Sequence, residues 1–390
     1  MENNFKLKSD ICFNMGSLQV LEEISGTHAF IVSDSIMEKL GYLQKTVDHL
    51  QKAGINSTVF TGVRPDPGIE VVAEGMKMYE ESGADVLVAI GGGSTIDTAK
   101  GILYFSWYMG DAINKEMKKP IFIAIPSTSG TGSEVTNFTV ITSDGEKVCL
   151  VDDFIAPDLA ILDSTCIQHV PQNVIADTGI DALVHAIEAY VSTKATDFTD
   201  ALSEKAIKLI FENIEKIYQD PKDSDARDRV QNASCMAGIA FTNTSLGINH
   251  SLAHAMGGAF HIPHGRANAI LLNPVIEYNS ELMGSANCYA AKKYAKLAEV
   301  LGLQARTYRE GVVNLMEAIE KLQRNLRIHK NVTALGIEKD KFEATIDQMA
   351  ETALVDRCTP TNPRKPSKED LKRSVIFFRS GCGLGITTEL

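Results

Sequence analysis

Hydrophobic positions in the first 165 residues form short continuous runs, separated by stretches with helical spacing. The runs predict strands at AFIVSD (29–34), NSTVFTGV (56–63), DVLVAIGGG (85–93), IFIAIP (121–126) and LAILD (159–163). Helical patterns lie between them, at about 36–53, 68–82 and 94–108. Because these runs are apolar throughout rather than alternating, we expect an open, largely parallel sheet with helices on both faces.

The pattern changes along the rest of the chain. Residues 139–151 (TVITSDGEKVCLV) predict a hairpin around the Asp144-Gly145 turn. After about Asp163 the apolar residues recur at helical spacing, and the polar, Pro-bearing stretches 219–228 and 357–370 predict loops. We therefore predict an α/β domain over residues 1–180 and an all-helical domain over residues 181–390.

Composition narrows the class of protein. The 390 residues are 44% hydrophobic and 23% charged, which is close to the average for soluble globular proteins. A net charge of -12 repels nucleic acid and anionic lipid, and no apolar run is long enough to span a membrane. The 7 cysteines include no CxxC pair, and the N-terminal MENNFKLKSD is too polar for a signal peptide. We expect a cytoplasmic protein with no nucleic-acid or membrane partner.

A glycine run follows one predicted strand. Gly91, Gly92 and Gly93 come directly after the apolar run, and Ser94 is placed to cap the next helix, with Asp97 as a capping partner. Glycine lets a ligand approach the backbone, and the first turn of a helix offers free N–H groups to a pyrophosphate. The alternative is an ordinary tight turn between strand and helix.

Two further features belong to the same edge of the predicted sheet. Asp34 ends the first strand, where an acid often binds the ribose of a dinucleotide, although capping of the next helix explains it equally well. The loop PSTSGTGSEVT (126–136) follows another strand and is rich in hydroxyl groups. Since ligands of open α/β sheets bind beyond the carboxyl ends of the strands, these loops favour a ligand site over a flexible connector.

Histidines are concentrated in the second half of the chain. His250, His254, His261 and His264 occupy one window of 15 residues. Asp181 and His185, like His250 and His254, are four residues apart and so lie on one face of a helix. A carboxylate and several imidazoles suit a divalent transition metal, and the absence of a neighbouring cysteine argues against a structural zinc site. A lone histidine on such a face is more often a hydrogen-bonded core residue.

Several segments together resemble the iron-dependent (group III) alcohol dehydrogenases. They are GGGSTIDTAK, PSTSGTGSEVT, DTGIDALVHAIEAYVS, TDALSEKAIKL and NHSLAHAMGGAFHIPHGRANAILLNPVI, and the resemblance covers about residues 5–385. The middle and end sections look most like the short-chain primary-alcohol branch, which includes 1-propanol dehydrogenases associated with propanediol-using microcompartments. The resemblance implies a Rossmann-like dinucleotide-binding domain, a helical metal-binding and substrate domain, and a metal in the cleft between them.

The resemblance also implies roles for individual residues. Asp181, His185, His250 and His264 match the family's ligands for the metal, which is Fe²⁺ or alternatively Zn²⁺. His254 matches a cleft histidine that aids proton movement. The residues implied to contact NAD(H) are Gly91, Gly92, Gly93, Ser94, Asp97, Thr128, Ser129, Thr131 and Lys147. Asp34 matches a position where members that use NAD carry an acidic residue, because a carboxylate there would repel the 2′-phosphate of NADP. Asp66 stands where many members carry Asn, so its role stays open.

The implied activity is a metal-dependent NAD(H) oxidoreductase that interconverts short-chain primary alcohols and aldehydes, with hydride transfer at the domain cleft. Examples are 1-propanol with propanal and 1-butanol with butanal. One alternative is a dehydroquinate synthase-like lyase of the same fold. Its phosphorylated, anionic substrate would require more cationic residues near the site than Arg266 alone. Another is a non-catalytic metal-binding component of a microcompartment. We expect a small-molecule substrate, a homodimer and, on the 1-propanol branch, association with a bacterial microcompartment.

Overall fold

The computed structural model describes residues 4–112, 118–143, 146–328 and 335–380. The chain divides into two compact units. The first holds Met1–Pro171 and Asp220–Thr242, and the second holds Gln172–Gln219 and Asn243–Leu390. Each unit buries a hydrophobic core of its own.

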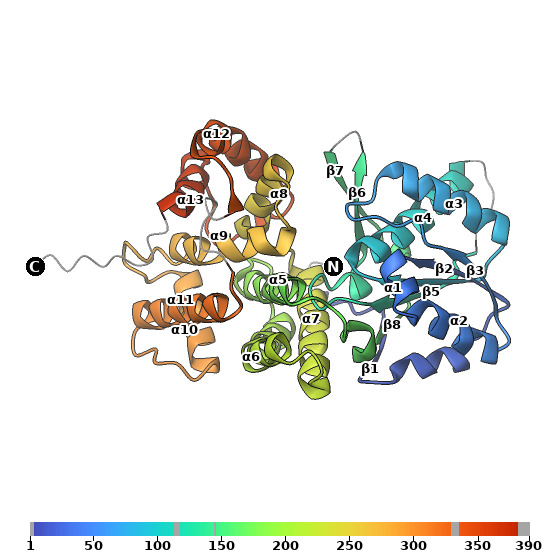
Figure 1. Cartoon of the computed structure of the whole chain (residues 1–390). Helices are drawn as coiled ribbons and strands as arrows, with labels where there is room; N and C mark the ends of the chain where they lie inside the picture. Colours follow the sequence, from blue (N-terminus) through green and yellow to red (C-terminus); the bar gives the residue numbers. More distant parts are fainter. Residues whose placement is uncertain (1–3, 113–117, 144–145, 329–334, 381–390) are drawn as a thin grey trace, which may run out of the picture. The chain divides into compact units, whose positions relative to one another are not determined.

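A six-stranded parallel sheet forms the centre of the first unit, with strand order β1-β8-β5-β4-β2-β3 (Figure 1). The strands are β1 (Asp10–Phe13), β2 (His28–Ser33), β3 (Asn56–Phe60), β4 (Val86–Gly91), β5 (Ile121–Pro126) and β8 (Leu159–Leu162). From β2 the chain first adds β3 on one side and then adds β4 on the other. This change of direction is a switch point, and it leaves the carboxyl ends of β2 and β4 open to a ligand.

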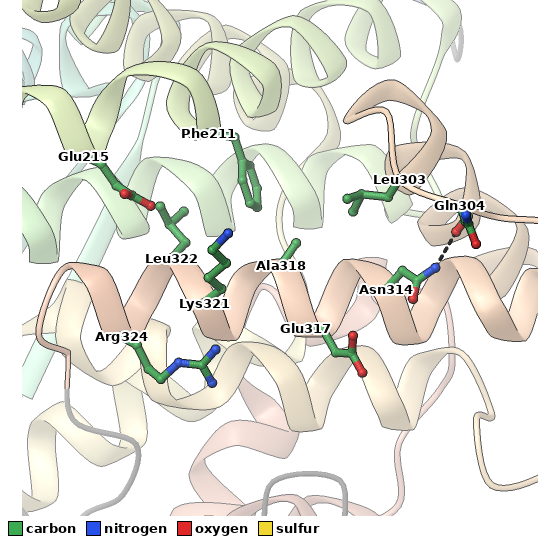
Figure 2. A pocket seen from close by; sticks show the side chains of 10 residues that line it. All are labelled: Phe211, Glu215, Leu303, Gln304, Asn314, Glu317, Ala318, Lys321, Leu322 and Arg324. Carbon is green, nitrogen blue, oxygen red and sulfur yellow. Dashed lines mark hydrogen bonds between the residues drawn. The ribbon is translucent and has the colours of Figure 1, made fainter.

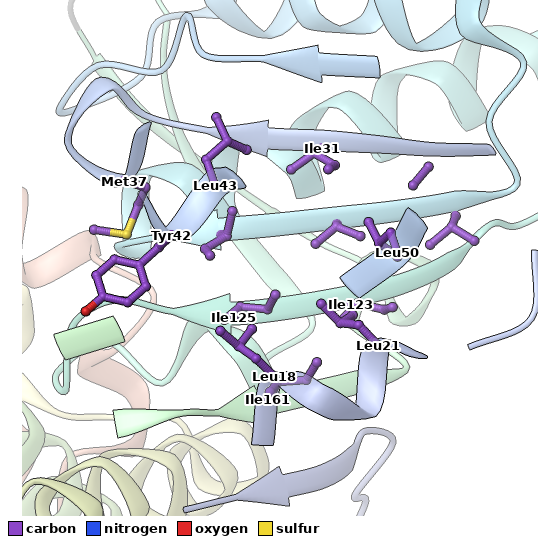
Figure 3. Close-up of a cluster of buried hydrophobic side chains, with 14 of the residues drawn as sticks. Leu18, Leu21, Ile31, Met37, Tyr42, Leu43, Leu50, Ile123, Ile125 and Ile161 are labelled. Atoms are coloured by element: carbon purple, nitrogen blue, oxygen red, sulfur yellow. The ribbon is translucent and has the colours of Figure 1, made fainter. Parts of the chain in front are cut away.

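Helices cover both faces of this sheet, as the apolar strands require. On one face η1 (Ser17–Glu23) and α2 (Tyr42–Lys52) bury Leu21 and Leu50 in one cluster with Ile31 and Ile123 of the sheet (Figure 3). On the other face α3 (Ile69–Ser82) and α4 (Gly93–Ala112) pack against Phe30, the next residue of β2 toward the N-terminus. Successive side chains of a strand point to opposite faces, so each strand contributes to both cores.

The predicted elements of the first unit are largely confirmed, with two differences. The helix expected over 36–53 is two helices, α1 (Ser35–Lys39) and α2, because Gly41 adopts a left-handed φ of 79° between them. Strand β1 has no continuous apolar run, since it is a partly exposed edge strand, and the hydrophobic pattern did not predict it. The hairpin is present as antiparallel β6 (Phe138–Ser143) and β7 (Glu146–Val151), while its Asp144-Gly145 turn lies outside the described residues.

The described chain beyond Asp163 contains helices and no strand, as predicted. The α-helices are α5 (Gln172–Val191), α6 (Asp197–Gln219), α7 (Ser224–Thr244), α8 (Ile248–Phe260), α9 (His264–Asn279), α10 (Tyr289–Val300), α11 (Tyr308–Asn325), α12 (Lys339–Val355) and α13 (Lys368–Ser380). The loop expected over 219–228 is shorter than predicted. Asp223 accepts a hydrogen bond from the backbone of Ala226 at 3.0 Å and so starts α7 within the polar stretch.

The core of the second unit lies among α8, α9, α12 and α13. Leu252, Leu271 and Phe342 are almost completely buried there. This packing fixes α8 and α9 beside each other, and both helices carry predicted metal ligands. None of the described helices is both long and apolar enough to cross a membrane.

Candidate functional site

Four predicted metal ligands lie together in the second unit, and we call them the metal cluster. Asp181 and His185 are one turn apart on α5 and share one face of that helix. His250 comes from the first turn of α8, and His264 is the first residue of α9. One potential ligand atom from each side chain lies within 4.8 Å of the other three. The structure thus brings together residues that are up to 83 positions apart in the chain (181 and 264).

Three potential ligand atoms of the metal cluster face a single amide nitrogen. Nε2 of His250 and Nε2 of His264 lie 3.9 and 3.6 Å from Asp181 Oδ1. Asn268 Nδ2 lies 2.7 Å from that oxygen and 3.1 Å from each of the two ring nitrogens. Three acceptors therefore compete for an amide that has two protons. Such a concentration of imidazole and carboxylate lone pairs suits a divalent transition metal such as Fe²⁺ or Zn²⁺.

Burial favours the neutral form of the His250 imidazole. The side chains of Asp181, His185 and His250 are buried, and His264 is the partly exposed member, at 37%. Burial lowers the pKa of His250 well below its usual value, and the neighbouring imidazoles act in the same direction. A neutral imidazole retains the lone pair that a metal ligand must supply. The donor set and its environment therefore fit a metal ion.

The start of α9 packs closely on α5, which sets the position of His264. A Cβ atom on Gly265 would lie only 2.2 Å from the backbone oxygen of Asp177, so the residue after His264 has no room for a side chain. Arg266 Nε donates to Asp177 Oδ1 at 2.5 Å and pairs the two helices. Arg266 is thus engaged with α5, one turn before Asp181.

Two buried residues beside the metal cluster were missed by the sequence analysis. Glu188 Oε2 lies 2.5 Å from Nδ1 of His250, and Asn268 faces the ligands as described above. Glu188 follows His185 by three residues, and Asn268 follows His264 by four, so helical spacing places each on the ligand face of its helix. That spacing is the signal that could have identified them.

His254 lies beside the metal cluster but is not one of its four members. Its ring stacks on that of His264 at 5.4 Å between centroids, and its Nδ1 lies 2.9 Å from Asp356 Oδ2. Burial acts to raise the pKa of Asp356, but the hydrogen bond and charge of His254 outweigh it and bring the pKa to about 2. Asp356 is 102 residues away in sequence, and no spacing signal connects it with His254. His261 ends α8 in a left-handed conformation and does not belong to the cluster.

Asp34 and the two predicted cofactor loops of the first unit meet at the switch point of the sheet. Gly91 ends β4, and its carbonyl accepts a hydrogen bond from the backbone of Ser127 at 2.9 Å, which joins the glycine run to the loop after β5. Asp34 follows β2, and its Oδ2 accepts a hydrogen bond from Thr95 Oγ1 at 3.1 Å. The glycine run, the 126–136 loop and Asp34 therefore lie together at the carboxyl ends of neighbouring strands.

Asp34 has a structural role as well. Its Oδ1 accepts hydrogen bonds from the backbone N–H groups of Ile36 and Met37 at 2.9 and 3.0 Å, so it caps α1. Helix capping, the alternative reading of this residue, is therefore seen in the structure. Capping leaves the side chain of Asp34 at the carboxyl end of β2, where its other oxygen also accepts from Thr95.

Ser94 and Asp97 do not cap the start of α4 as predicted. Helix α4 begins at Gly93, so Ser94 lies inside its first turn. Asp97 instead accepts a hydrogen bond from Ser133 Oγ at 2.8 Å and another from the backbone of Val140 at 3.3 Å. Asp97 therefore connects α4 with the 126–136 loop and with β6.

The 126–136 loop carries hydroxyl groups with different partners. Thr131 Oγ1 accepts from the backbone N–H of Ser133 at 3.3 Å, and Thr128 lies beside Gly92. Ser129 Oγ is buried and has no hydrogen-bond partner among the described residues. An unpaired buried hydroxyl is costly unless a ligand satisfies it, so this loop fits a bound cofactor. Lys147 on β7 forms an exposed ion pair with Asp66 at 2.7 Å.

A buried lysine that the sequence analysis did not single out supports the same loop. Lys100 Nζ donates to Thr136 Oγ1, Ser133 Oγ and the Phe138 carbonyl at 2.7, 3.2 and 2.9 Å. Burial lowers the pKa of Lys100 to about 8, while the carboxylates of Asp97 and Glu134 act in the opposite direction. Its three hydrogen bonds tie α4 to the end of the 126–136 loop.

A surface hollow of about 600 Å³ is separate from these sites (Figure 2). It lies between α6 and α11, is lined by Phe211, Leu303, Ala318 and Leu322, and is bordered by charged groups such as Lys321. It shares no residue with the metal cluster. No predicted site residue lines it.

The fold and the metal cluster define a class of protein that sequence comparison also finds. A family model described as "Iron-containing alcohol dehydrogenase" matches residues 9–164, and one described as "Fe-containing alcohol dehydrogenase family, C-terminal" matches residues 175–375. The chain belongs to the iron-containing alcohol dehydrogenase family. It is therefore an oxidoreductase that acts on alcohols and aldehydes.

Two named relatives and one solved structure are similar to this chain over nearly its whole length. An NADPH-dependent butanol dehydrogenase of Clostridium saccharobutylicum is 38% identical over 95% of this chain and 96% of its own. A 1-propanol dehydrogenase of Citrobacter freundii is also 38% identical, over 93% of this chain and 95% of its own. Among solved structures, a 1,3-propanediol oxidoreductase has a TM-score of 0.89 at 31% identity and covers 96% of this chain and 99% of its own.

These findings confirm the predicted fold class, the predicted family and the predicted type of activity. They also support iron as the metal. NAD(H) as the dinucleotide is a proposal, because the butanol dehydrogenase named above is NADPH-dependent. The findings give no support to the lyase or to the non-catalytic microcompartment component. The residue roles implied by the resemblance, the number of subunits and a microcompartment location are proposals rather than findings.

Proposed function

We propose that the protein interconverts short-chain primary alcohols and aldehydes, with a metal held by Asp181, His185, His250 and His264 and with NAD(H) bound at the switch point of the sheet. The observation that carries the proposal is the buried metal cluster, whose four side chains lie within 4.8 Å of one another. The relatives named for butanol and 1-propanol support a substrate of three or four carbons. From the resemblance to the 1-propanol dehydrogenase branch, we also propose a homodimer that associates with a bacterial microcompartment.

The metal and the protein supply different parts of the chemistry. When bound, a divalent metal is a Lewis acid that polarises the oxygen of an alcohol or aldehyde. The metal cluster would hold it through three imidazoles and one carboxylate. The glycine run and the hydroxyl groups of the 126–136 loop would hold the dinucleotide and leave its nicotinamide C4 to exchange hydride with the substrate carbon. Hydride transfer requires the two binding sites to meet during turnover.

The alcohol also loses a proton during oxidation, and His254 is placed to take it. The Nδ1 of His254 faces Asp356 Oδ2 at 2.9 Å, so Nδ1 is the donor of that hydrogen bond and Nε2 is the basic nitrogen. Its side chain is 35% exposed, which gives the proton a route to water. In oxidation the hydroxyl proton would pass to His254 Nε2 and the hydride to NAD⁺; in reduction both would move in the opposite direction.

The activity is tested with the purified wild-type protein under anaerobic conditions. We expect the Fe²⁺-loaded protein to oxidise one NADH for each aldehyde reduced, with the largest kcat/KM for propanal and butanal in a series from ethanal to hexanal. Metal-free protein should be inactive and should recover on addition of Fe²⁺ or Zn²⁺. Failure to consume NADH with any aldehyde of the series would refute the proposed function.

The cofactor preference is tested at Asp34. We expect Asp34→Asn to raise the ratio of kcat/KM for NADPH to that for NADH by about 10-fold, which corresponds to removal of ~1.4 kcal/mol of repulsion from the 2′-phosphate. Asn caps a helix as well as Asp does, so the fold should be retained. Asp48→Asn, an exposed change on α2, removes the same charge elsewhere and should leave the ratio unchanged. An equal response of both variants would contradict a role for position 34.

A further inference from the structure

The strongest unassigned feature of the second unit is the carboxylate of Glu188, which is 3% exposed and lies behind the metal cluster. It follows Asp181 by seven residues on α5 and so lies on the same face of the helix. Its two oxygens have different partners, both at the start of α8. Oε1 accepts from the backbone N–H of Asn249 at 2.8 Å, and Oε2 lies 2.5 Å from Nδ1 of His250.

The position of the proton on His250 follows from its other ring nitrogen. Nε2 of His250 faces the amide nitrogen of Asn268 at 3.1 Å. The orientation of that amide is fixed by its oxygen, which accepts a hydrogen bond from Asn249 Nδ2 at 2.9 Å. Nε2 therefore faces a donor and carries no proton. The ring proton is on Nδ1, from which it is donated to Glu188.

A glycine just before α8 leaves space for the Glu188 carboxylate. A Cβ atom on Gly247, the residue before α8, would lie 2.8 Å from Glu188 Oε1 and 2.7 Å from the side-chain oxygen of Asn362. The backbone N–H groups of Gly247 and His250 also face the carboxylate. Burial raises the pKa of Glu188 to about 8, and these backbone N–H groups at the first turn of α8 act in the opposite direction by stabilising the charged form.

We propose that Glu188 is a positioning residue for the metal site: it holds His250 in the Nδ1–H tautomer and so keeps the Nε2 lone pair directed at the metal. This inference rests on the proposed ligand set. A hydrogen bond from the remote nitrogen of a ligating histidine to a carboxylate fixes the tautomer and raises the basicity of the ligand. Glu188 also joins α5 to the start of α8, the helix that carries both His250 and His254.

The variant E188Q separates this role from simple packing, because the new side chain has nearly the same shape and size as glutamate. One end of its amide is an NH₂ group, and both partners of the carboxylate are donors. Turned one way, the NH₂ group faces Nδ1 of His250 and favours the Nε2–H tautomer, which is unable to bind a metal. Turned the other way, it faces the N–H of Asn249 and leaves the start of α8 without its acceptor.

The test is metal affinity, measured by competition between the apo-protein and a chromophoric chelator for Co²⁺. We expect E188Q to bind Co²⁺ about 10- to 100-fold more weakly than the wild type and to shift the visible absorption bands of the bound ion. Glu204→Gln is the matched control, because Glu204 is a partly buried acceptor on α6 of the same unit, hydrogen-bonded to Tyr190 Oη at 2.7 Å, and is not a member of the metal cluster. That control should bind Co²⁺ with wild-type affinity.

A second measurement needs no variant. In proton NMR spectra of the Co²⁺-loaded wild type, ligating histidines give hyperfine-shifted N–H signals. We expect one of them to exchange slowly with water, because the His250 side chain is 1% exposed and its Nδ1–H is bonded to Glu188. Absence of a slowly exchanging signal would overturn the proposal even if E188Q fails to fold.

The outcomes distinguish this inference from the ligand assignment. If the wild type binds no metal, the proposed metal site itself is wrong. If the wild type binds Co²⁺ and a folded E188Q binds it with the same affinity and spectrum, the metal site stands and the role of Glu188 is refuted. Circular dichroism and thermal unfolding of the apo-proteins establish whether E188Q is folded before its affinity is compared.

Discussion

Replacing His264 with alanine is expected to reduce metal affinity by more than about 100-fold, beyond the range found for residues that only support a ligand. His264 brings the third imidazole to a cluster whose other members come from α5 and α8. Its loss leaves two imidazoles and one carboxylate, and aldehyde reduction should fall to the level of metal-free protein. Bound metal is measured by elemental analysis after dialysis, and turnover by NADH absorbance.

His261→Asn is the control for this change. His261 is exposed at the end of α8 and has a left-handed φ of 53°, a conformation that asparagine tolerates better than most residues. The control removes an imidazole three residues from His264 and should retain both the metal and the activity. Normal metal content together with full activity in His264→Ala would eliminate His264 from the ligand set.

Gly265→Ala is expected to disturb the same site through the backbone. The added Cβ would lie 2.2 Å from the backbone oxygen of Asp177, so α9 has to move away from α5. Overpacking of this kind destabilises proteins by about 1–3 kcal/mol. Because His264 precedes this glycine directly, we also expect metal affinity to fall by about 10-fold or more, as it does when the support of a ligand is lost. Urea unfolding and chelator competition measure the two effects.

Gly258→Ala is the control for Gly265→Ala, because it makes the same change at another helical glycine of the second unit. This glycine lies in α8, is exposed, and has nothing within 4 Å of its Cβ position. Gly258→Ala should stabilise the protein by about 0.5–1 kcal/mol, because alanine loses less conformational freedom than glycine in a helix. Similar destabilisation by both variants would show that the close approach of α9 to α5 is not the cause.

The parts of this molecule that the sequence predicts are those with a local signal. Continuous apolar runs such as IFIAIP predict buried strands, and the four-residue spacing of Asp181 and His185 predicts a shared helix face. The glycine run was placed correctly at the end of β4. Strand β1 had no such signal, because only an edge position in the sheet and pairing with β8 make it a strand.

Residues that support the site were harder to predict, because their partners are distant in the chain. Asp356 contacts His254 across 102 positions, and Lys100 contacts Thr136 across 36. Neither residue belongs to a recognisable pattern of spacing, and a buried lysine contradicts the usual rule that lysines are exposed. Glu188 is the exception, since its helical register with His185 was visible in the sequence.

The order of the two units along the chain has a consequence for synthesis and truncation. The chain leaves the first unit at residue 171 and returns to it for residues 220–242, which include most of α7. Gln231 of this returning helix donates to the carbonyl of Pro126 at 3.3 Å, at the start of the loop expected to bind the cofactor. A fragment that ends at residue 171 lacks this contact. On the ribosome, the dinucleotide-binding unit is therefore complete only after α6 of the other unit has already been made.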